Sequence, residues 1–197
     1  MKKLLLIALC LSILTLTACD FDWLLEDDEP VSTTAPAAGN SGNPDGEQGS
    51  SDNGFYLPEE FDFTATDIYG NAVTGETLGE KQVFFVHLWA TWCPPCINEM
   101  PDLAQLALDY GDKVGFIGLL DDYDSNLDGA ISIVESAGVP DSFVTLDAND
   151  DSVAPLLEAV KSGYFPTTVL ITSDGLSEQI VGAKGSKYVE YLDEIVT

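Results

Sequence analysis

The sequence contains no arginine, and its 197 residues include only 7 basic side chains against 34 acidic ones. The formal net charge at pH 7 is therefore -27, with the one histidine counted as neutral. A surface of this charge repels phosphate backbones, which excludes nucleic acid as a partner. It also repels anionic lipid headgroups, so contact with a membrane is expected only through an anchor.

Histidine and cysteine are also scarce, with one His87 and the cysteines Cys10, Cys19, Cys93 and Cys96. A small disulfide-stapled domain needs several bridges, and a tetrahedral zinc site needs four ligands. If the first two cysteines serve export, two thiols and one imidazole remain, which is too few for either. We expect no resident metal and no other cofactor.

The N-terminus is typical of an exported protein. Two lysines precede a short apolar run, and residues 1–18 are predicted to be a lipoprotein signal peptide. Residues 16–19, LTAC, resemble the lipobox of bacterial lipoproteins, which implies that Cys19 receives a diacylglyceryl group and becomes the new N-terminus. The protein is then extracytoplasmic and anchored to the cell membrane. A plain secretory signal or an uncleaved anchor is the alternative.

The next segment differs in composition from the rest of the chain. Residues 19–54 are rich in Asp, Ser, Gly and Pro and have no regular apolar period, so we interpret them as a lipid-anchored disordered linker. Residues 55–197 are predicted to form the folded domain.

Strand and helix patterns alternate along this domain. The run KQVFFVHLWA at 81–90 is almost continuously apolar, as expected for a central strand that is covered on both faces. Further strands are predicted at 114–120, 142–148, 167–175 and 176–185, a hairpin within 61–75, and helices at 96–112, 129–138 (capped by Asp128), 153–160 and 187–196. The pattern indicates a three-layer α/β sandwich with a mixed sheet.

Cys93 and Cys96 form a CxxC motif at the end of a predicted strand and the beginning of a helix. Unpaired N–H groups and the helix dipole favour an anion at this point, so Cys93 is expected to be the thiolate nucleophile. Cys96, one turn further on, can attack the mixed disulfide that Cys93 forms with a substrate. An inert structural disulfide is the alternative.

The stretch VHLWATWCPPCINEMP, with YFPTTVLITSDG downstream, resembles the TlpA/ResA family of membrane-anchored thiol-disulfide oxidoreductases. The resemblance covers residues 57–197 and implies a thioredoxin-like fold with an added N-terminal β-hairpin. It also implies that Cys93 attacks, that Cys96 resolves, and that Pro166 is a cis-proline facing them. The turn at Pro166 is expected to expose the backbone of Phe165 to a substrate segment, beside a partly exposed Trp92.

Two further residues acquire candidate roles from this resemblance. Glu99 stands three residues after Cys96, where the family often has an acid near the disulfide; it either transfers protons or merely favours the first turns of its helix. His87 replaces a residue that is a buried acid in thioredoxins and that we expect to be asparagine in this branch. A neutral imidazole there can accept the proton of the resolving thiol, whereas a packed histidine bonded to a backbone carbonyl is the alternative.

A second pattern fits a calcium loop. Asp124, Asn126, Asp128 and Glu135 have the spacing of D-x-[DN]-x-[DN]-G-x5-E, with Gly129 at the turn. The element before it is predicted to be a strand instead of a helix, and Asp128 is already explained as an N-cap. Acidic chains produce such patterns readily, so we expect no calcium site here.

The predicted function is thiol-disulfide exchange with exported protein substrates, most readily as a reductase supplied by a membrane electron carrier. A peroxiredoxin is a rival of the same fold, but its P-x-x-x-T-x-x-C motif is missing, since Ala90 stands three residues before Cys93. A copper chaperone is the other rival, and it would need wider cysteine spacing and a histidine on a later loop.

Overall fold

The computed structural model describes residues 55–177 and 179–196. The predicted signal peptide, the linker at 19–54 and the lipidation site Cys19 lie outside these residues. Within the described part of the chain, no helix is both long and apolar enough to cross a membrane.

Strands and helices follow one another largely as the sequence predicts. The order is η1 (Glu59–Phe61), β1 (Thr64–Thr66), β2 (Ala72–Thr74), α1 (Gly75–Leu78), β3 (Val83–Trp89), α2 (Pro94–Tyr110), β4 (Val114–Leu120), α3 (Tyr123–Ala137), β5 (Phe143–Asp147), η2 (Asp151–Val153), α4 (Ala154–Val160), β6 (Thr167–Thr172), β7 (Gly175–Leu176), β8 (Ile180–Val181), η3 (Gly185–Lys187) and α5 (Tyr188–Ile195). The structure adds the short helix α1 and the 3-10 turns, and it divides the last predicted strand into β7 and β8.

The central sheet is mixed, as predicted. Its strand order is β5-β4-β3-β6-β7, and β8 also pairs with β6. The pairs β3–β4 and β4–β5 are parallel, whereas β3–β6 is antiparallel. All seven residues of β3 and of β4 are buried, which explains their almost continuous apolar runs.

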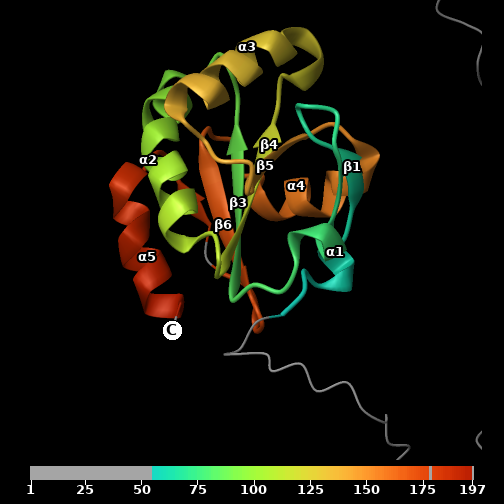
Figure 1. The fold of residues 1–197 in the computed structure, drawn as a ribbon, viewed down its shortest axis with the longest axis vertical. Helices are drawn as coiled ribbons and strands as arrows, with labels where there is room; N and C mark the ends of the chain where they lie inside the picture. The colour runs from blue at the N-terminus through green and yellow to red at the C-terminus, as the bar shows by residue number, and fades with distance from the viewer. Residues whose placement is uncertain (1–54, 178, 197) are drawn as a thin grey trace, which may run out of the picture. The chain divides into compact units, whose positions relative to one another are not determined.

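Helices cover both faces of the sheet (Figure 1). The steps β3-α2-β4 and β4-α3-β5 move in the same direction across the sheet, so crossovers of one hand place α2 and α3 on the same face. Helix α5 packs on this face too, while α4 and the N-terminal hairpin cover the other.

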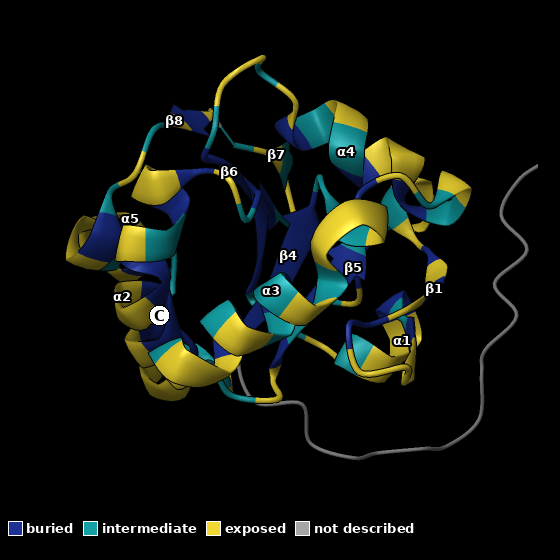
Figure 2. Ribbon diagram, turned by 90° about the horizontal axis from the view of Figure 1, so that it is seen from above, coloured by how far each residue is buried: buried dark blue, intermediate teal, exposed yellow. Residues whose placement is uncertain are grey.

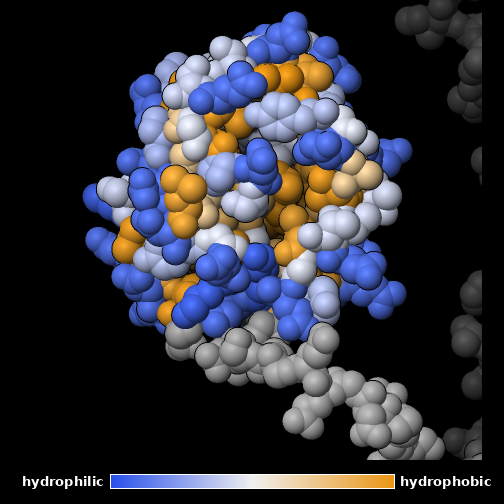
Figure 3. All heavy atoms as spheres, in the orientation of Figure 1, coloured by the Kyte–Doolittle hydropathy of each residue, from blue (hydrophilic) through white to orange (hydrophobic). Residues whose placement is uncertain are grey.

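Successive residues of β3 serve the two halves of the core. Phe85 and Trp89 face α2 and α5, whereas Phe84, Val86 and Leu88 face α4 and the hairpin. Figure 2 shows the buried strands between helices whose outer surfaces are exposed. On the face drawn in Figure 3, hydrophilic side chains predominate and the apolar ones form separate patches.

The added hairpin is a separate two-stranded sheet in which β1 and β2 pair antiparallel, with Thr66 opposite Ala72. Its turn is stabilised by Asp67, whose carboxylate accepts hydrogen bonds from the backbone N–H groups of Tyr69 and Asn71. The hairpin predicted within 61–75 is therefore confirmed.

The start of α3 was predicted wrongly. The helix begins at Tyr123 with Asp122 as its N-cap, so Asp128 lies inside α3 and does not cap it. The backbone leaves helical geometry at Asn126, whose side chain lies over Gly129; a Cβ at Gly129 would approach the Asn126 side chain to 2.5 Å. Gly129, which follows the expected cap Asp128, instead leaves room for the Asn126 side chain at this kink.

Gly115 in β4 has no room for a side chain. A Cβ there would lie 2.5 Å from Cδ1 of Phe84, whose fully buried ring packs edge-to-face on Phe55. We expect Gly115→Ala to lower the free energy of unfolding by about 1–3 kcal/mol, because the ring has to shift within a packed core. Urea denaturation measures the free energy of unfolding. An unchanged midpoint would show that the core accommodates the added methyl group without cost.

Candidate active site

Cys93 and Cys96 form a disulfide at the beginning of α2, with their Cα atoms 5.3 Å apart. Cys93 is the N-cap, and its Sγ accepts a hydrogen bond from the backbone N–H of Cys96 at 3.3 Å. Pro94 occupies the first helical position, where a missing N–H has no consequence. The predicted place of Cys93 at a helix N-terminus is confirmed, and in the reduced protein the same N–H faces the sulfur that becomes the thiolate.

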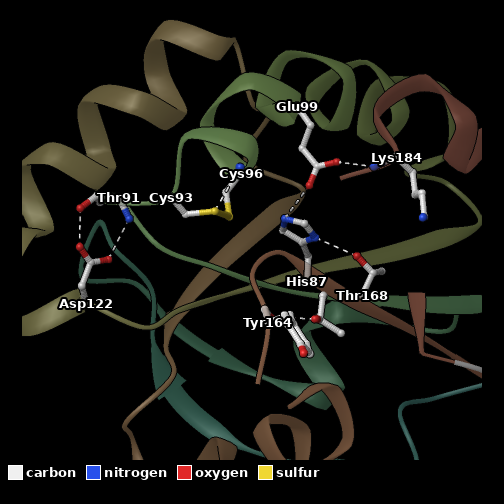
Figure 4. Close-up of a disulfide and its surroundings, with 10 residues drawn as sticks. His87, Thr91, Cys93, Cys96, Glu99, Asp122, Tyr164, Thr168 and Lys184 are labelled. Atoms are coloured by element: carbon white, nitrogen blue, oxygen red, sulfur yellow. Dashed lines mark hydrogen bonds and ion pairs between the residues drawn. A yellow bond between two sulfur atoms is a disulfide. The ribbon is translucent and has the colours of Figure 1, made fainter. Parts of the chain in front are cut away.

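The loop before Cys93 is hydrogen-bonded to Asp122, which follows the end of β4. Thr91 donates from its backbone N–H to Oδ1 of Asp122 at 2.9 Å, and its hydroxyl donates to Oδ2 of the same carboxylate. Asn126 in turn donates to the Thr91 hydroxyl at 2.7 Å. Figure 4 shows the Thr91–Asp122 contact beside the disulfide. Residues at the kinked start of α3 thus fix the position of the loop that precedes Cys93.

An aromatic pair lies next to the cysteines. Trp92 is 58% exposed although both cysteines are buried, and its ring meets that of Phe165 with centroids 5.0 Å apart. The Phe165–Pro166 peptide bond is cis, as the resemblance implies. Among the hydrogen bonds of the described residues, none uses the backbone of Phe165. The turn therefore lies beside the active-site loop with that backbone free to pair.

Glu99 points into the protein and is only 4% exposed. Its Oε2 accepts hydrogen bonds from the backbone N–H groups of Lys184 at 2.9 Å and Gly185 at 3.1 Å. Burial raises the pKa of Glu99, and these two hydrogen bonds oppose the rise. If Glu99 only favoured the first turns of α2, its carboxylate would not need to be buried and bonded to the turn at Lys184 and Gly185.

His87 is fully buried in β3, opposite Thr168 of β6. Its Nδ1 lies 2.9 Å from the hydroxyl of Thr168, which lies 2.8 Å from the hydroxyl of Tyr188. Burial lowers the pKa of His87 to about 3, so the imidazole is neutral near pH 7. The alternative prediction named a backbone carbonyl as the hydrogen-bond partner of His87. It is wrong on this point, since the partner is the side-chain hydroxyl of Thr168.

His87 and Glu99 meet in the interior. Nε2 of His87 is 3.5 Å from Oε1 of Glu99, and neither atom has a hydrogen-bond partner among the described residues. Figure 4 shows the imidazole beneath the carboxylate, with the disulfide to one side. Because Glu99 stands one turn after Cys96 on α2, the structure groups both candidate proton carriers behind the resolving cysteine.

The calcium pattern does not form a loop. Asp124, Asn126, Asp128 and Glu135 all lie within α3, and the Asn126 side chain is engaged with Thr91. The described residues contain no group of three or more His, Cys, Asp and Glu side chains that could hold a metal ion.

Residues 46–186 match the Redoxin family. The chain belongs to the Redoxin family. It is 31% identical over 135 residues to the thiol-disulfide oxidoreductase ResA of Bacillus thuringiensis (strain Al Hakam), which covers 68% of this chain and 74% of that protein. Because the chain also has the Cys93–Cys96 disulfide, it is a ResA-like thiol-disulfide oxidoreductase within this family.

Solved structures show the same fold. A thiol:disulfide interchange protein of the thioredoxin family from Chlorobium tepidum TLS has a TM-score of 0.60 at 19% identity, covering 75% of this chain and 100% of that one. The exposed lipoprotein thioredoxin Etrx1 of Streptococcus pneumoniae strain TIGR4 has a TM-score of 0.51 at 20% identity, covering 68% and 98%. The fold of this Redoxin is thus thioredoxin-like, as expected.

Several residues of the site were not predicted, and they are Thr91, Asp122, Thr168, Lys184, Gly185 and Tyr188. Thr168 carried a weak signal, because a hydroxyl in the apolar run TTVLI stands two residues after Pro166 and needs a buried partner. Tyr188 and Asp122 are brought to the site from distant parts of the chain, so local patterns do not reveal them.

The neutral state of His87 makes stability depend on pH. The unfolded chain binds a proton at His87 near pH 6.5, whereas the folded protein does so only near pH 3. In this window the unfolded state holds the extra proton, so the free energy of unfolding falls as the pH is lowered, by up to about 1.4 kcal/mol per pH unit. The raised pKa of Glu99 acts with the opposite sign, since its contribution is present below its unfolded pKa and is lost as the pH rises.

We therefore expect His87→Asn to reduce the slope of stability against pH between about 6 and 4. Urea denaturation of the oxidised protein and the variant at several pH values measures the slope, whatever the variant's absolute stability. Equal slopes would mean that His87 is already protonated in the folded protein.

Proposed function

We propose that the protein reduces disulfide bonds of exported proteins while it is anchored to the membrane through Cys19. The observation that carries the proposal is the Cys93–Cys96 pair at the N-terminus of α2, beside an exposed aromatic residue and an unpaired backbone segment. A substrate strand pairing with the backbone of Phe165 would bring its disulfide to Cys93, with Trp92 packing against its side chains.

The proposed reaction has two exchange steps. The Cys93 thiolate attacks one sulfur of the substrate disulfide, which forms a mixed disulfide and releases the other sulfur as a thiolate that takes up a proton. Cys96 then gives up its proton and attacks the sulfur of Cys93, which releases the second substrate thiol. The substrate gains two electrons and two protons, and the protein is left with the Cys93–Cys96 disulfide. A membrane electron carrier returns two electrons, with two protons, to complete the cycle.

The direction of exchange is supported by the surroundings of the sulfurs. Both cysteines are buried, and the buried acid nearest in sequence, Glu99, follows Cys96 by one turn. Burial and a neighbouring acid disfavour a thiolate at Cys96, and burial also opposes the stabilisation that the N-terminus of α2 gives to a thiolate at Cys93. A reduced pair whose thiolate is weakly stabilised gives up its electrons readily, which suits a reductase.

The two cysteines should fail in different ways. We expect Cys93→Ser to abolish reduction of a test protein disulfide in the presence of a dithiol, because no nucleophile remains. Cys96→Ser should accumulate mixed disulfides, because nothing resolves them. Turnover assays and non-reducing gels measure these outcomes, and full activity in the Cys93→Ser protein would refute the proposed function.

The anchor rests on the lipobox-like residues 16–19 and on the fold shared with an exposed lipoprotein thioredoxin. We expect Cys19→Ala to remove labelling by a metabolic fatty-acid probe, since the acyl acceptor is lost. Cys10→Ala is the matched control, and it should stay labelled because Cys10 lies within the predicted signal peptide. A parent protein that never takes up the probe would exclude the lipid anchor.

A further inference from the structure

Two buried polar atoms remain without a hydrogen bond in the site. Nε2 of His87 and Oε1 of Glu99 have no partner among the described residues, and they face each other at 3.5 Å. Buried polar atoms are nearly always hydrogen-bonded, and site contacts in resting structures are often longer than in the working state. One proton between these two atoms would satisfy both at once.

The charge state of the contact follows from its surroundings. An imidazolium facing a carboxylate would place two charges in the interior, and such a pair regains its desolvation penalty only when further hydrogen bonds complete it. The carboxylate has two backbone N–H donors on Oε2, whereas the fully buried ring has a neutral hydroxyl, that of Thr168, at its other nitrogen, and burial lowers the pKa of His87 to about 3. A contact with no proton would oppose two lone pairs. A neutral imidazole with one proton in the contact is the arrangement that remains.

The hydroxyls on the Nδ1 side of the imidazole are compatible with two protonation patterns of this kind. The hydroxyls of Thr168 and Tyr188 can each donate or accept. With Glu99 ionised, Nε2–H donates to Oε1 and Nδ1 accepts from Thr168. With Glu99 protonated, its O–H donates to Nε2, Nδ1–H donates to Thr168, and the Thr168 hydroxyl turns to Tyr188.

We propose that His87 is a neutral positioning residue whose tautomer changes with the protonation of Glu99, so that this buried acid can accept and return a proton behind Cys96. The proposal rests on the proposed function for its place in the cycle: the proton that Cys96 gives up when it attacks the mixed disulfide moves to Glu99. The ring loses its proton at Nε2 and gains one at Nδ1 by exchange with solvent, so the pair holds one more proton in total and the imidazole stays neutral. No buried donor or acceptor in the pair is left unpaired in either state, because the imidazole exchanges the ends at which it donates and accepts.

Other charged and titratable groups face the pair from each element packed around it. They are Cys96 and Asp102 on α2, Lys184 before η3, and Tyr188 on α5, while β6 contributes only the Thr168 hydroxyl. Asp102 accepts from the backbone N–H of Ser186, just as Glu99 accepts from Lys184 and Gly185. Asp102 is exposed, however, and its charge acts on Glu99 through space, where it raises the pKa of that acid. It therefore offers a matched control.

The imidazole can be observed directly by ¹⁵N NMR, because His87 is the one histidine in the whole chain. In the ¹⁵N-labelled, oxidised full chain, we expect the Nε2–H tautomer near pH 8 and a shift to the Nδ1–H tautomer as Glu99 takes up a proton, with no imidazolium signal down to about pH 4. An imidazolium at neutral pH would overturn the proposal, as would one unchanging tautomer over this range.

Glu99→Gln mimics the protonated acid. Its carbonyl can still accept from the two backbone N–H groups, and its NH2 faces Nε2, so we expect the Nδ1–H tautomer at every pH. Asp102→Asn makes the same change on the same helix and should keep the change of tautomer with pH, with its midpoint moved to lower pH because the Asp102 charge raises the pKa of Glu99. An unchanged tautomer in Glu99→Gln would contradict the proposal. Should that variant fail to fold, the wild-type titration still decides.

A kinetic measurement connects the pair to the cycle. His87→Asn keeps an amide near Glu99 but has no tautomer to exchange, so we expect release of the mixed disulfide to slow by on the order of 10²-fold, with attack by Cys93 unaffected and the pH dependence of release lost. Unchanged release would reduce His87 to a packing role. A failure of this proposal can be distinguished from a failure of the proposed function, because the NMR experiment uses the oxidised protein and needs no turnover.

Discussion

Burial of β3 on both faces is the constraint on which the active site depends. The strand lies between β4 and β6, and each of its residues is covered by helices on one side or the other. A rigid strand of this kind delivers the following loop to a defined place, where Cys93 caps α2. The same burial makes a polar residue in the strand expensive, since it has to find its partners within the protein. His87 is that residue, and its surroundings are organised around satisfying it.

The chemistry of the site follows from how this requirement is met. Thr168 lies directly across the β3–β6 pairing and provides a hydroxyl to one ring nitrogen, while α2 brings Glu99 to the other. The low polarity of the interior keeps the imidazole neutral and favours protonation of the acid. An imidazole that stays neutral and an acid whose pKa is raised suit the proposed transfer of one proton at a time to and from Glu99.

The sequence predicted the parts of this arrangement that are local. Long apolar runs identify β3 and β4, and the CxxC motif after such a run places Cys93 at a helix N-terminus. The parts that were missed depend on contacts between distant segments. The true start of α3 follows from Asp122 binding Thr91 and from Asn126 folding over Gly129, and the sequence around Asp128 carries no sign of either contact. The partner of His87 was expected to be a backbone carbonyl because the β3–β6 register, which sets Thr168 opposite, is a tertiary property.

The turn at Lys184–Gly185 links the acidity of the site to the packing of the C-terminal helix. Glu99 and Asp102 stand one turn apart on α2, and both accept backbone N–H groups of this turn. Gly185 has a φ of 53°, and a Cβ there would lie 2.3 Å from Oδ2 of Asp102, so the close approach depends on glycine. The exposed carboxylate thus holds the turn against α2, and the turn presents two N–H groups to the buried one. Because those donors oppose the rise in the pKa of Glu99, the position of η3 and of α5 behind it determines how readily the acid beside Cys96 takes up its proton.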